Sequence, residues 1–141
     1  MNGASIYDII NSEKNGGLKM FAVIMLSALN LLLPLTMVIC GVWFLKSPPD
    51  MNDVVGYRTR RSMASPKCWA AAHRICGKLW LGFGIFTGII AVICGIFSAI
   101  KVKEADNGFY FFILGEEAFQ LAFMLGAIAL TEARLKKIFH N

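Results

Sequence analysis

A short polar stretch between two apolar runs holds the side chains best suited to chemistry. Arg58 and Thr59 follow a glycine and a tyrosine, and Ser62 comes three residues later. A guanidinium with nearby hydroxyls and backbone N–H groups can bind a phosphate or a planar anion, because arginine offers two parallel donors. Ordinary positive loop charge with loop hydroxyls explains the pattern equally well, so both interpretations stay open. The candidate ligand- or anion-binding residues are Asn52, Gly56, Tyr57, Arg58, Thr59, Ser62, Trp69, His73 and Arg74.

Two adjacent glutamates, Glu116 and Glu117, interrupt an apolar run near the C-terminus. A carboxylate inside a bilayer costs a few kcal/mol on insertion scales, so such groups are usually paired, protonated or functional. Gln120 shares the helical face of Glu116, and Asn30 is the nearest candidate partner in depth by counting along the spans. We expect these four residues either to hold helices together by hydrogen bonds or to form a cation, proton or ligand site.

No motif for a metal or a cofactor accompanies these groups. The two histidines lie far apart, and the four cysteines have neither a CxxC pair nor zinc-ligand spacing. No P-loop or dinucleotide fingerprint is present, and no nucleophile lies beside a base. The sequence therefore predicts no metal site and no cofactor, and it favours a protein that is not an enzyme.

The elements that must position these residues are membrane helices. Of the 141 residues, 57% are hydrophobic and 16% are charged, whereas soluble domains have about 45–50% and about 25%. Each apolar run reaches the roughly 20 residues that a membrane span needs. We predict one all-α membrane domain with three transmembrane helices and a short interfacial amphipathic helix in the loop. The predicted segments are an extracytoplasmic stretch 1–17, spans 18–45, 79–100 and 109–130, a basic loop 46–78 with the interfacial helix at 66–78, an outer turn 101–108 and a cytoplasmic tail 131–141.

Two patterns predict how the helices lie. Ser65 and Pro66 form a helix start signal, and Trp69 lies on one face of the helix that follows, so we expect tryptophan at headgroup depth. Gly84 and Gly88 in the second span allow close approach of backbones. We expect them to pack against the third span, with a homodimer contact as the alternative.

The lysines and arginines predict the orientation. The predicted loop holds seven of them and the tail three, whereas the opposite side holds four. This asymmetry predicts an outer N-terminus and a cytoplasmic loop and C-terminus. The net charge of +5 is thus concentrated beside apolar runs, where anionic lipid headgroups, rather than nucleic acid, are the expected partner.

The segment from Gly56 to Lys78 resembles the signature of the SdpI family of bacterial membrane proteins. The matching residues are Gly56-Tyr57-Arg58-Thr59, Ser62, Trp69, His73-Arg74 and Gly77-Lys78, in that order and ahead of an apolar helix. The family's named member confers immunity against a secreted peptide toxin and holds a transcriptional repressor at the membrane. That member resembles a doubled version of the three-span module predicted for this chain.

The resemblance implies immunity or resistance to a membrane-active peptide toxin by binding or sequestration, with signalling as a further role. It also implies a multi-pass protein of the bacterial cytoplasmic membrane, and we expect Arg58→Ala to weaken protection. Two alternatives stay open: an enzyme or transporter for a lipid or phosphorylated compound, and an accessory subunit of a larger membrane complex. The expected partners are membrane lipids, a peptide toxin, and a homodimer or larger membrane complex.

Overall fold

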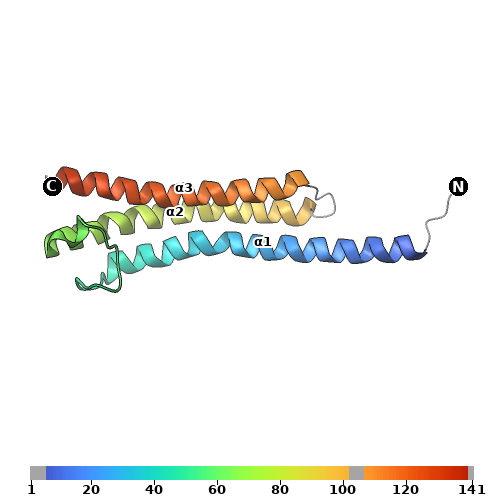
Figure 1. Ribbon diagram of the computed structural model, residues 1–141, viewed down its shortest axis with the longest axis horizontal. Helices are drawn as coiled ribbons and strands as arrows, with labels where there is room; N and C mark the ends of the chain where they lie inside the picture. The colour runs from blue at the N-terminus through green and yellow to red at the C-terminus, as the bar shows by residue number, and fades with distance from the viewer. Residues whose placement is uncertain (1–5, 102–106, 140–141) are drawn as a thin grey trace.

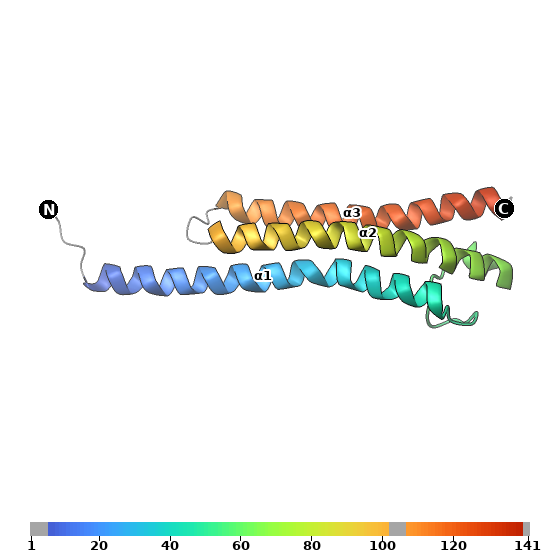
Figure 2. The same ribbon diagram turned by 180° about the vertical axis from the view of Figure 1, so that it is seen from behind.

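The computed structural model describes residues 6–101 and 107–139, and these form helices and one irregular loop, without a strand. Three long helices lie side by side (Figures 1 and 2). The loop after the first helix lies at the same end of the bundle as the end of the third helix, and the first helix begins at the other end. We call these the loop end and the far end. The elements are α1 (Ile6–Lys46), the 3₁₀ helix η1 (Ser62–Ala64), α2 (Pro66–Lys101) and α3 (Asn107–Phe139).

Each long helix contains a segment that is long and apolar enough to cross a bilayer. Among the described residues these segments are Gly16–Lys46, Pro66–Lys101 and Phe111–Phe139. Large apolar side chains such as Leu18, Ile93 and Phe111 are more than 60% exposed on the bundle surface. A contiguous apolar surface of this kind suits lipid rather than water. The prediction of an all-α fold with three transmembrane helices is confirmed.

The helices extend further than the predicted spans. α1 begins at Ile6, so Gly16 and Gly17 lie inside it, and α3 continues through the predicted tail to Phe139. The middle of the predicted outer turn, residues 102–106, lies outside the described residues.

The helix predicted at 66–78 forms the first turns of α2 and runs on into the second span without a break. Its aromatic face is also not available to lipid headgroups, because it is buried inside the protein. Trp69 is 3% exposed and His73 is fully buried, because the loop folds back over this face. The Trp69 indole N–H donates to the Pro49 carbonyl at 2.7 Å. The amphipathic pattern was thus correct about a helix, but the apolar face packs inside the protein.

Glycines bring α1 and α2 into close contact. A Cβ at Gly41 of α1 would lie 2.7 Å from the Leu81 backbone nitrogen, and one at Gly77 of α2 would lie 3.1 Å from the Gly41 carbonyl. A Cβ at Gly84 would lie 3.0 Å from the Pro34 carbonyl. The expectation that Gly84 and Gly88 pack against the third span is therefore wrong. Spacing reveals a small-residue face but not which neighbour fills it, and here Pro34 of α1 lies against both glycines.

α3 packs against α2 mainly through aromatic rings. The Phe123 ring lies 5.2 Å from that of Phe83 and 5.5 Å from that of Phe86. The α3 glycines Gly115 and Gly126 have no neighbour within 4 Å of an added Cβ. These two glycines therefore do not hold α3 to the bundle.

Candidate functional site

The loop of residues 47–65 begins with a turn built on Asn52. The Asn52 Oδ1 atom accepts hydrogen bonds from the backbone N–H groups of Val54 at 2.8 Å and Val55 at 2.7 Å. Its Nδ2 donates to the Asp50 carbonyl at 2.6 Å. Asparagine stabilises turns in this way by replacing backbone acceptors and donors. Asn52 is thus used to shape the loop.

Gly56 lets the chain pass directly over the aromatic face of α2. Its φ is 118°, a region that side chains with a Cβ rarely adopt. An added Cβ would lie 2.6 Å from the Nε2 atom of His73 and 2.9 Å from the Trp69 ring. Glycine is therefore required here for two reasons, backbone conformation and space.

His73 ties the loop to α2 through both of its ring nitrogens. Nε2 accepts the backbone N–H of Tyr57 at 3.0 Å, and Nδ1 lies 2.9 Å from the Trp69 carbonyl, to which it must donate. This pair of contacts assigns the proton to Nδ1 and defines a neutral imidazole. The buried histidine holds the start of the Tyr57–Ser62 segment in place and has no nitrogen left for a ligand.

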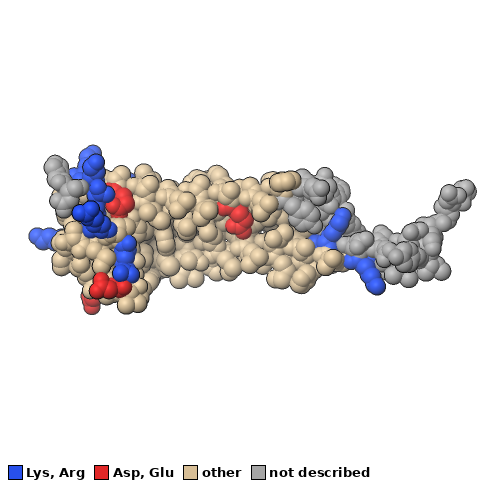
Figure 3. Space-filling view, in the orientation of Figure 1, with Lys and Arg blue, Asp and Glu red and all other residues tan. Residues whose placement is uncertain are grey.

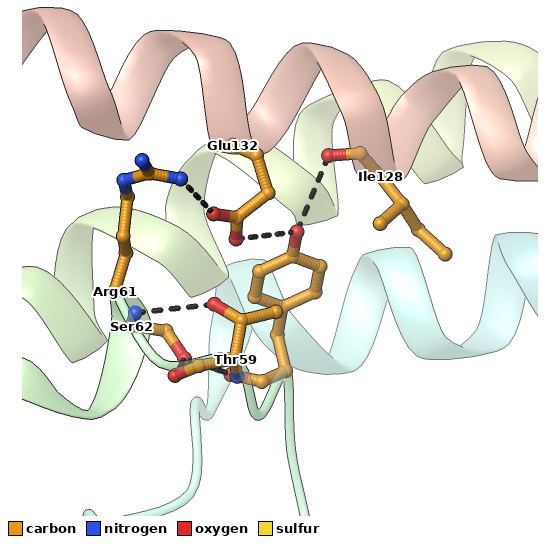
Figure 4. A network of polar contacts seen from close by, with 6 residues as sticks. Thr59, Arg61, Ser62, Ile128 and Glu132 are labelled. Atoms are coloured by element: carbon orange, nitrogen blue, oxygen red, sulfur yellow. Dashed lines mark hydrogen bonds and ion pairs between the residues drawn. The ribbon is translucent and has the colours of Figure 1, made fainter.

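Tyr57 reaches from the loop to α3, where Glu132 also meets Arg61 (Figure 4). The side chain is 7% exposed, and its hydroxyl lies 3.1 Å from Glu132 Oε1 and 3.3 Å from the Ile128 carbonyl. Arg61 pairs with the other oxygen of Glu132 at 3.2 Å. Burial, together with the nearby Glu132 carboxylate, raises the pKa of Tyr57 above its usual range, so the phenol is a neutral donor. The Glu132 carboxylate of α3 therefore binds two residues of the loop, Tyr57 and Arg61.

Thr59 and Ser62 bond to each other. The Thr59 N–H donates to Ser62 Oγ at 2.8 Å, and the Ser62 N–H donates to Thr59 Oγ1 at 3.2 Å. Ser62 is fully buried, and its hydroxyl lies 2.8 Å from the Tyr57 carbonyl. These hydroxyls close the turn that leads into η1. We call the group of Gly56, Tyr57, Thr59, Ser62, Trp69 and His73, with Arg61 and Glu132, the loop lock.

Arg58 and Arg74 are not part of the loop lock. Both are exposed, and no hydrogen bond joins either of them to the hydroxyls of Thr59 and Ser62. Basic side chains gather at the loop end of the molecule instead (Figure 3). The structure thus brings most of the predicted anion-binding residues together, but they satisfy one another and leave the two arginines on the surface.

Within the spans, three polar side chains form a layer across the bundle. Asn30, Glu116 and Gln120 are 3%, 8% and 0% exposed. The Gln120 Nε2 atom lies 3.4 Å from Asn30 Oδ1 and 3.4 Å from Glu116 Oε1. We call these three residues the polar layer. Its two hydrogen bonds are long, and the Gln120 Oε1 atom is buried with no hydrogen-bond partner among the described residues.

Glu117 points away from the polar layer, as neighbours on a helix must. It lines a groove of about 330 Å³ together with residues of α1 and with Trp80 of α2. Cys94 and Glu116 line a second groove between α2 and α3. Among the described residues, no three His, Cys, Asp or Glu side chains gather in a way that could hold a metal ion.

The sequence interpretation missed Arg61, Glu132 and Trp80. Glu132 stands in a basic tail, and this isolated negative charge was the available signal. Its partner Arg61 is 71 residues away, and no local pattern connects them. Trp80 resembles an ordinary interfacial tryptophan, and only the structure shows that its indole N–H is buried and has no partner within residues 6–101 and 107–139.

The fold, the loop lock and the polar layer define the class of protein. The chain is a multi-pass α-helical membrane protein, with three helices able to span the bilayer and a packed loop that closes one end. Residues 50–131 match the model of the SdpI/YfhL protein family, and the chain belongs to this family. The matched stretch contains the loop lock except Glu132, all of α2, and Glu116, Glu117 and Gln120 of α3.

One relative is the uncharacterized protein YfhL of Bacillus subtilis (strain 168). It is 33% identical to this chain over 106 residues, which cover 74% of this chain and 84% of the relative. No solved structure matches the chain.

Proposed function

We propose that this protein gives immunity or resistance to a membrane-active peptide toxin by binding it within the bilayer. The observation that carries the proposal is the polar layer with Glu117 beside it. Glu116 lies nine residues from the start of α3 at Asn107, or about 14 Å at 1.5 Å per residue. That depth is inside a hydrocarbon core of about 30 Å, where ionisable groups are costly and mark functional positions by default. The immunity role implied by the family resemblance agrees with this location.

The geometry of the loop favours binding over catalysis. An enzyme or transporter for a phosphorylated compound would need the hydroxyls of Thr59 and Ser62 and the ring of His73 to face a ligand. These groups bond to one another and to the backbone. The loop lock is therefore better explained as the device that fixes the loop to α2 and α3.

For the exposed basic residues of the loop end we propose contact with anionic lipid headgroups, since each such residue near an anionic surface contributes about 1 kcal/mol. This assignment places the loop end and the C-terminus in the cytoplasm of a bacterial cell and the N-terminus outside. Fusion of a fluorescent protein to the C-terminus should then give fluorescent cells, and fusion of alkaline phosphatase at the same place should give inactive phosphatase.

A survival assay tests the proposed function. Bacteria sensitive to membrane-active peptides would express the chain or carry an empty vector, and both would be challenged with a panel of such peptides. We expect the chain to raise survival against at least one peptide. Gln120→Leu, which removes the centre of the polar layer, should reduce that protection at equal membrane levels, whereas Asp53→Asn, an exposed loop change, should not. Equal survival with and without the chain across the panel would contradict the proposal.

An outward face of α3 supports a second candidate, a homodimer or an accessory subunit of a larger complex. Gly115 and Gly126 face open space, and Ala118 and Ala122 between them are exposed. Small residues at this spacing let another helix approach closely in lipid. Purification in mild detergent followed by native mass spectrometry should then show a second copy or a stoichiometric partner. A monomer alone would exclude this role.

A further inference from the structure

The loop carries an apolar tip that the bundle leaves uncovered. We call residues 50–55 the loop tip, and three of its large apolar side chains are exposed, Met51 at 41%, Val54 at 81% and Val55 at 42%. Val54 is the most exposed large apolar side chain among the described residues, and the other exposed ones lie on the three candidate spans, where they suit lipid. Exposed apolar patches mark surfaces that meet a membrane or a protein. The loop tip therefore needs a partner of its own.

Trp69 of α2 holds the loop tip from both ends. Just before the tip, the Pro49 carbonyl accepts the Trp69 indole N–H at 2.7 Å. Just after the tip, Gly56 passes over the same ring, since an added Cβ would lie 2.9 Å from it. Between these points Asn52 closes the turn through three hydrogen bonds to backbone groups. The backbone that presents the apolar side chains is thus anchored to α2 on both sides.

The loop tip lies close to the end of α1. Pro49 follows Lys46, the last residue of α1, by three residues, and three residues span at most about 11 Å. Lys46 and the exposed Trp43 belong to the residue types that gather where a span leaves the hydrocarbon. The loop runs beside the end of α1 at the side of the bundle and does not extend beyond the beginning of α2 (Figures 1 and 2). Its position therefore continues the apolar, lipid-facing surface of α1.

Two carboxylates limit how deep the loop tip can enter a bilayer. Asp50 and Asp53 are exposed and alternate with the apolar residues of the tip. A carboxylate is costly inside the hydrocarbon, so the tip can reach the headgroups and the first methylene groups but no deeper. The same negative charges are repelled by anionic headgroups. Apolar contact, rather than charge, is therefore the force that can bring the tip to a membrane.

We propose that the loop tip inserts into the headgroup region of the adjacent leaflet, with Met51, Val54 and Val55 against the upper acyl chains. Because Trp69 holds both ends of the tip, this contact also fixes the depth at which the first turns of α2 lie. The inference goes beyond the lipid contact of the basic residues, since the tip needs no anionic lipid. It does not rest on the immunity function or on which leaflet faces the cytoplasm.

Paramagnetic broadening in lipid nanodiscs tests the insertion. The full chain carries ¹³C-methyl-labelled valine, and the signals lost in Val54→Ile belong to Val54. One probe is a phosphatidylcholine with a nitroxide high on its acyl chain, and the other is a water-soluble gadolinium chelate. We expect the nitroxide to broaden the Val54 signals, as it should those of Val92 on the exposed face of α2, while the chelate leaves most of their intensity. Pure phosphatidylcholine and a mixture with anionic phosphatidylglycerol should give the same result.

The variant Val54→Asp perturbs the tip and is read at Val55. Val54 is exposed, so the change leaves the packing of the bundle intact, and the added carboxylate draws the tip out of the leaflet. The Val55 signals should lose most of their broadening by the nitroxide and gain broadening by the chelate. Ser47→Asp is the matched control, because it adds the same charge at an exposed position outside the tip. It should leave the Val55 signals as in the wild type.

Broadening of the Val54 signals by the chelate but not by the nitroxide would overturn the inference and make the tip a surface for a soluble protein. Contact with lipid only when phosphatidylglycerol is present would overturn it too, because the basic residues would then hold the loop at the membrane. So would an equal response of Val55 in Ser47→Asp and Val54→Asp. None of these outcomes changes what the survival assay should show, so failure here is separate from failure of the proposed immunity function.

Discussion

Gly56 is the residue on which the geometry of the loop depends. Its backbone has φ of 118°, and it passes within contact distance of His73 and Trp69. The contacts of Tyr57 depend on this passage. Its N–H donates to His73, and its hydroxyl lies near Glu132. The Gly-Tyr-Arg-Thr stretch is thus explained by architecture at three of its four positions, and Arg58 is the exception.

Gly56→Ala should therefore destabilise the protein. Backbone strain of this kind costs roughly 1–3 kcal/mol, and the added Cβ also meets His73 Nε2 at 2.6 Å. Thermal unfolding in detergent, followed by tryptophan fluorescence, measures the effect. Gly82→Ala is the matched control, because a Cβ there meets nothing within 4 Å. Equal midpoints for the two variants would show that the loop does not need glycine at position 56.

The phenol of Tyr57 should ionise at unusually high pH. Burial is the larger cause of its raised pKa, and the Glu132 carboxylate is the next. Because the folded pKa exceeds the unfolded value of about 10, the neutral phenol contributes stability that is complete below that pH and is lost as the pH rises through the folded pKa. Absorbance of tyrosinate, with Tyr57→Phe to identify the step, gives the pKa.

Glu132→Gln should lower that pKa without returning it to its ordinary value, since burial remains. A Tyr57 that titrates with an ordinary pKa in the wild-type protein would mean that the phenol is not packed between the loop and α3.

At the scale of elements, α1 and α2 form the close pair, and α3 is added through aromatic rings and through the loop lock. Gly41, Gly77 and Gly84 allow the first contact, whereas Phe123 and the Tyr57–Glu132–Arg61 group provide the second. The Arg61–Glu132 pair is partly exposed, so it contributes little free energy by itself. Its role is to position the loop.

Gly41→Ala should push α1 and α2 apart, because the added Cβ would lie 2.7 Å from the Leu81 backbone nitrogen, which cannot move aside alone. Overpacking of this kind costs about 1–3 kcal/mol. The unfolding midpoint in detergent should fall, while Gly126→Ala on α3, where a Cβ meets nothing within 4 Å, should leave it unchanged. A fall in the second variant alone would reverse the assignment of the close helix pair.

The predictable parts of this structure were those that local sequence expresses. The lengths of the apolar runs predicted the three helices. Counting residues along the spans predicted that Asn30 lies at about the depth of Glu116, and in the structure Gln120 bridges the two. Contacts between distant elements were not predictable. The amphipathic face around Trp69 has the same pattern whether it meets headgroups or a folded loop, and nothing near Arg61 in sequence indicates Glu132. The partner of Gly84 was missed for the same reason.

At the scale of the whole molecule, the polar features divide between two levels. The loop lock lies at the loop end, and the polar layer with Glu117 lies deep within the spans; Glu116 and Glu132 are 16 residues apart on α3, or about 24 Å. The polar groups of the loop lock form hydrogen bonds with one another and with the backbone. At the depth of the polar layer, in contrast, Gln120 Oε1 is buried with no partner among the described residues, and Glu117 lines a groove. This division supports the proposals that a ligand is recognised within the bilayer and that the loop serves architecture and lipid contact.

Survival under peptide challenge, compared between Glu117→Gln and the double variant Arg58→Ala/Arg74→Ala at equal membrane levels, tests this division most directly. Loss of a charge-assisted hydrogen bond of about 1.5–3 kcal/mol corresponds to a roughly tenfold or greater loss of affinity. We predict that Glu117→Gln loses most of the protection. The double arginine variant should retain most of it, which replaces the expectation from sequence that Arg58→Ala weakens protection, because both arginines lie on the surface outside the loop lock. Full protection by Glu117→Gln together with its loss in the arginine variant would contradict the account and return recognition to the basic loop.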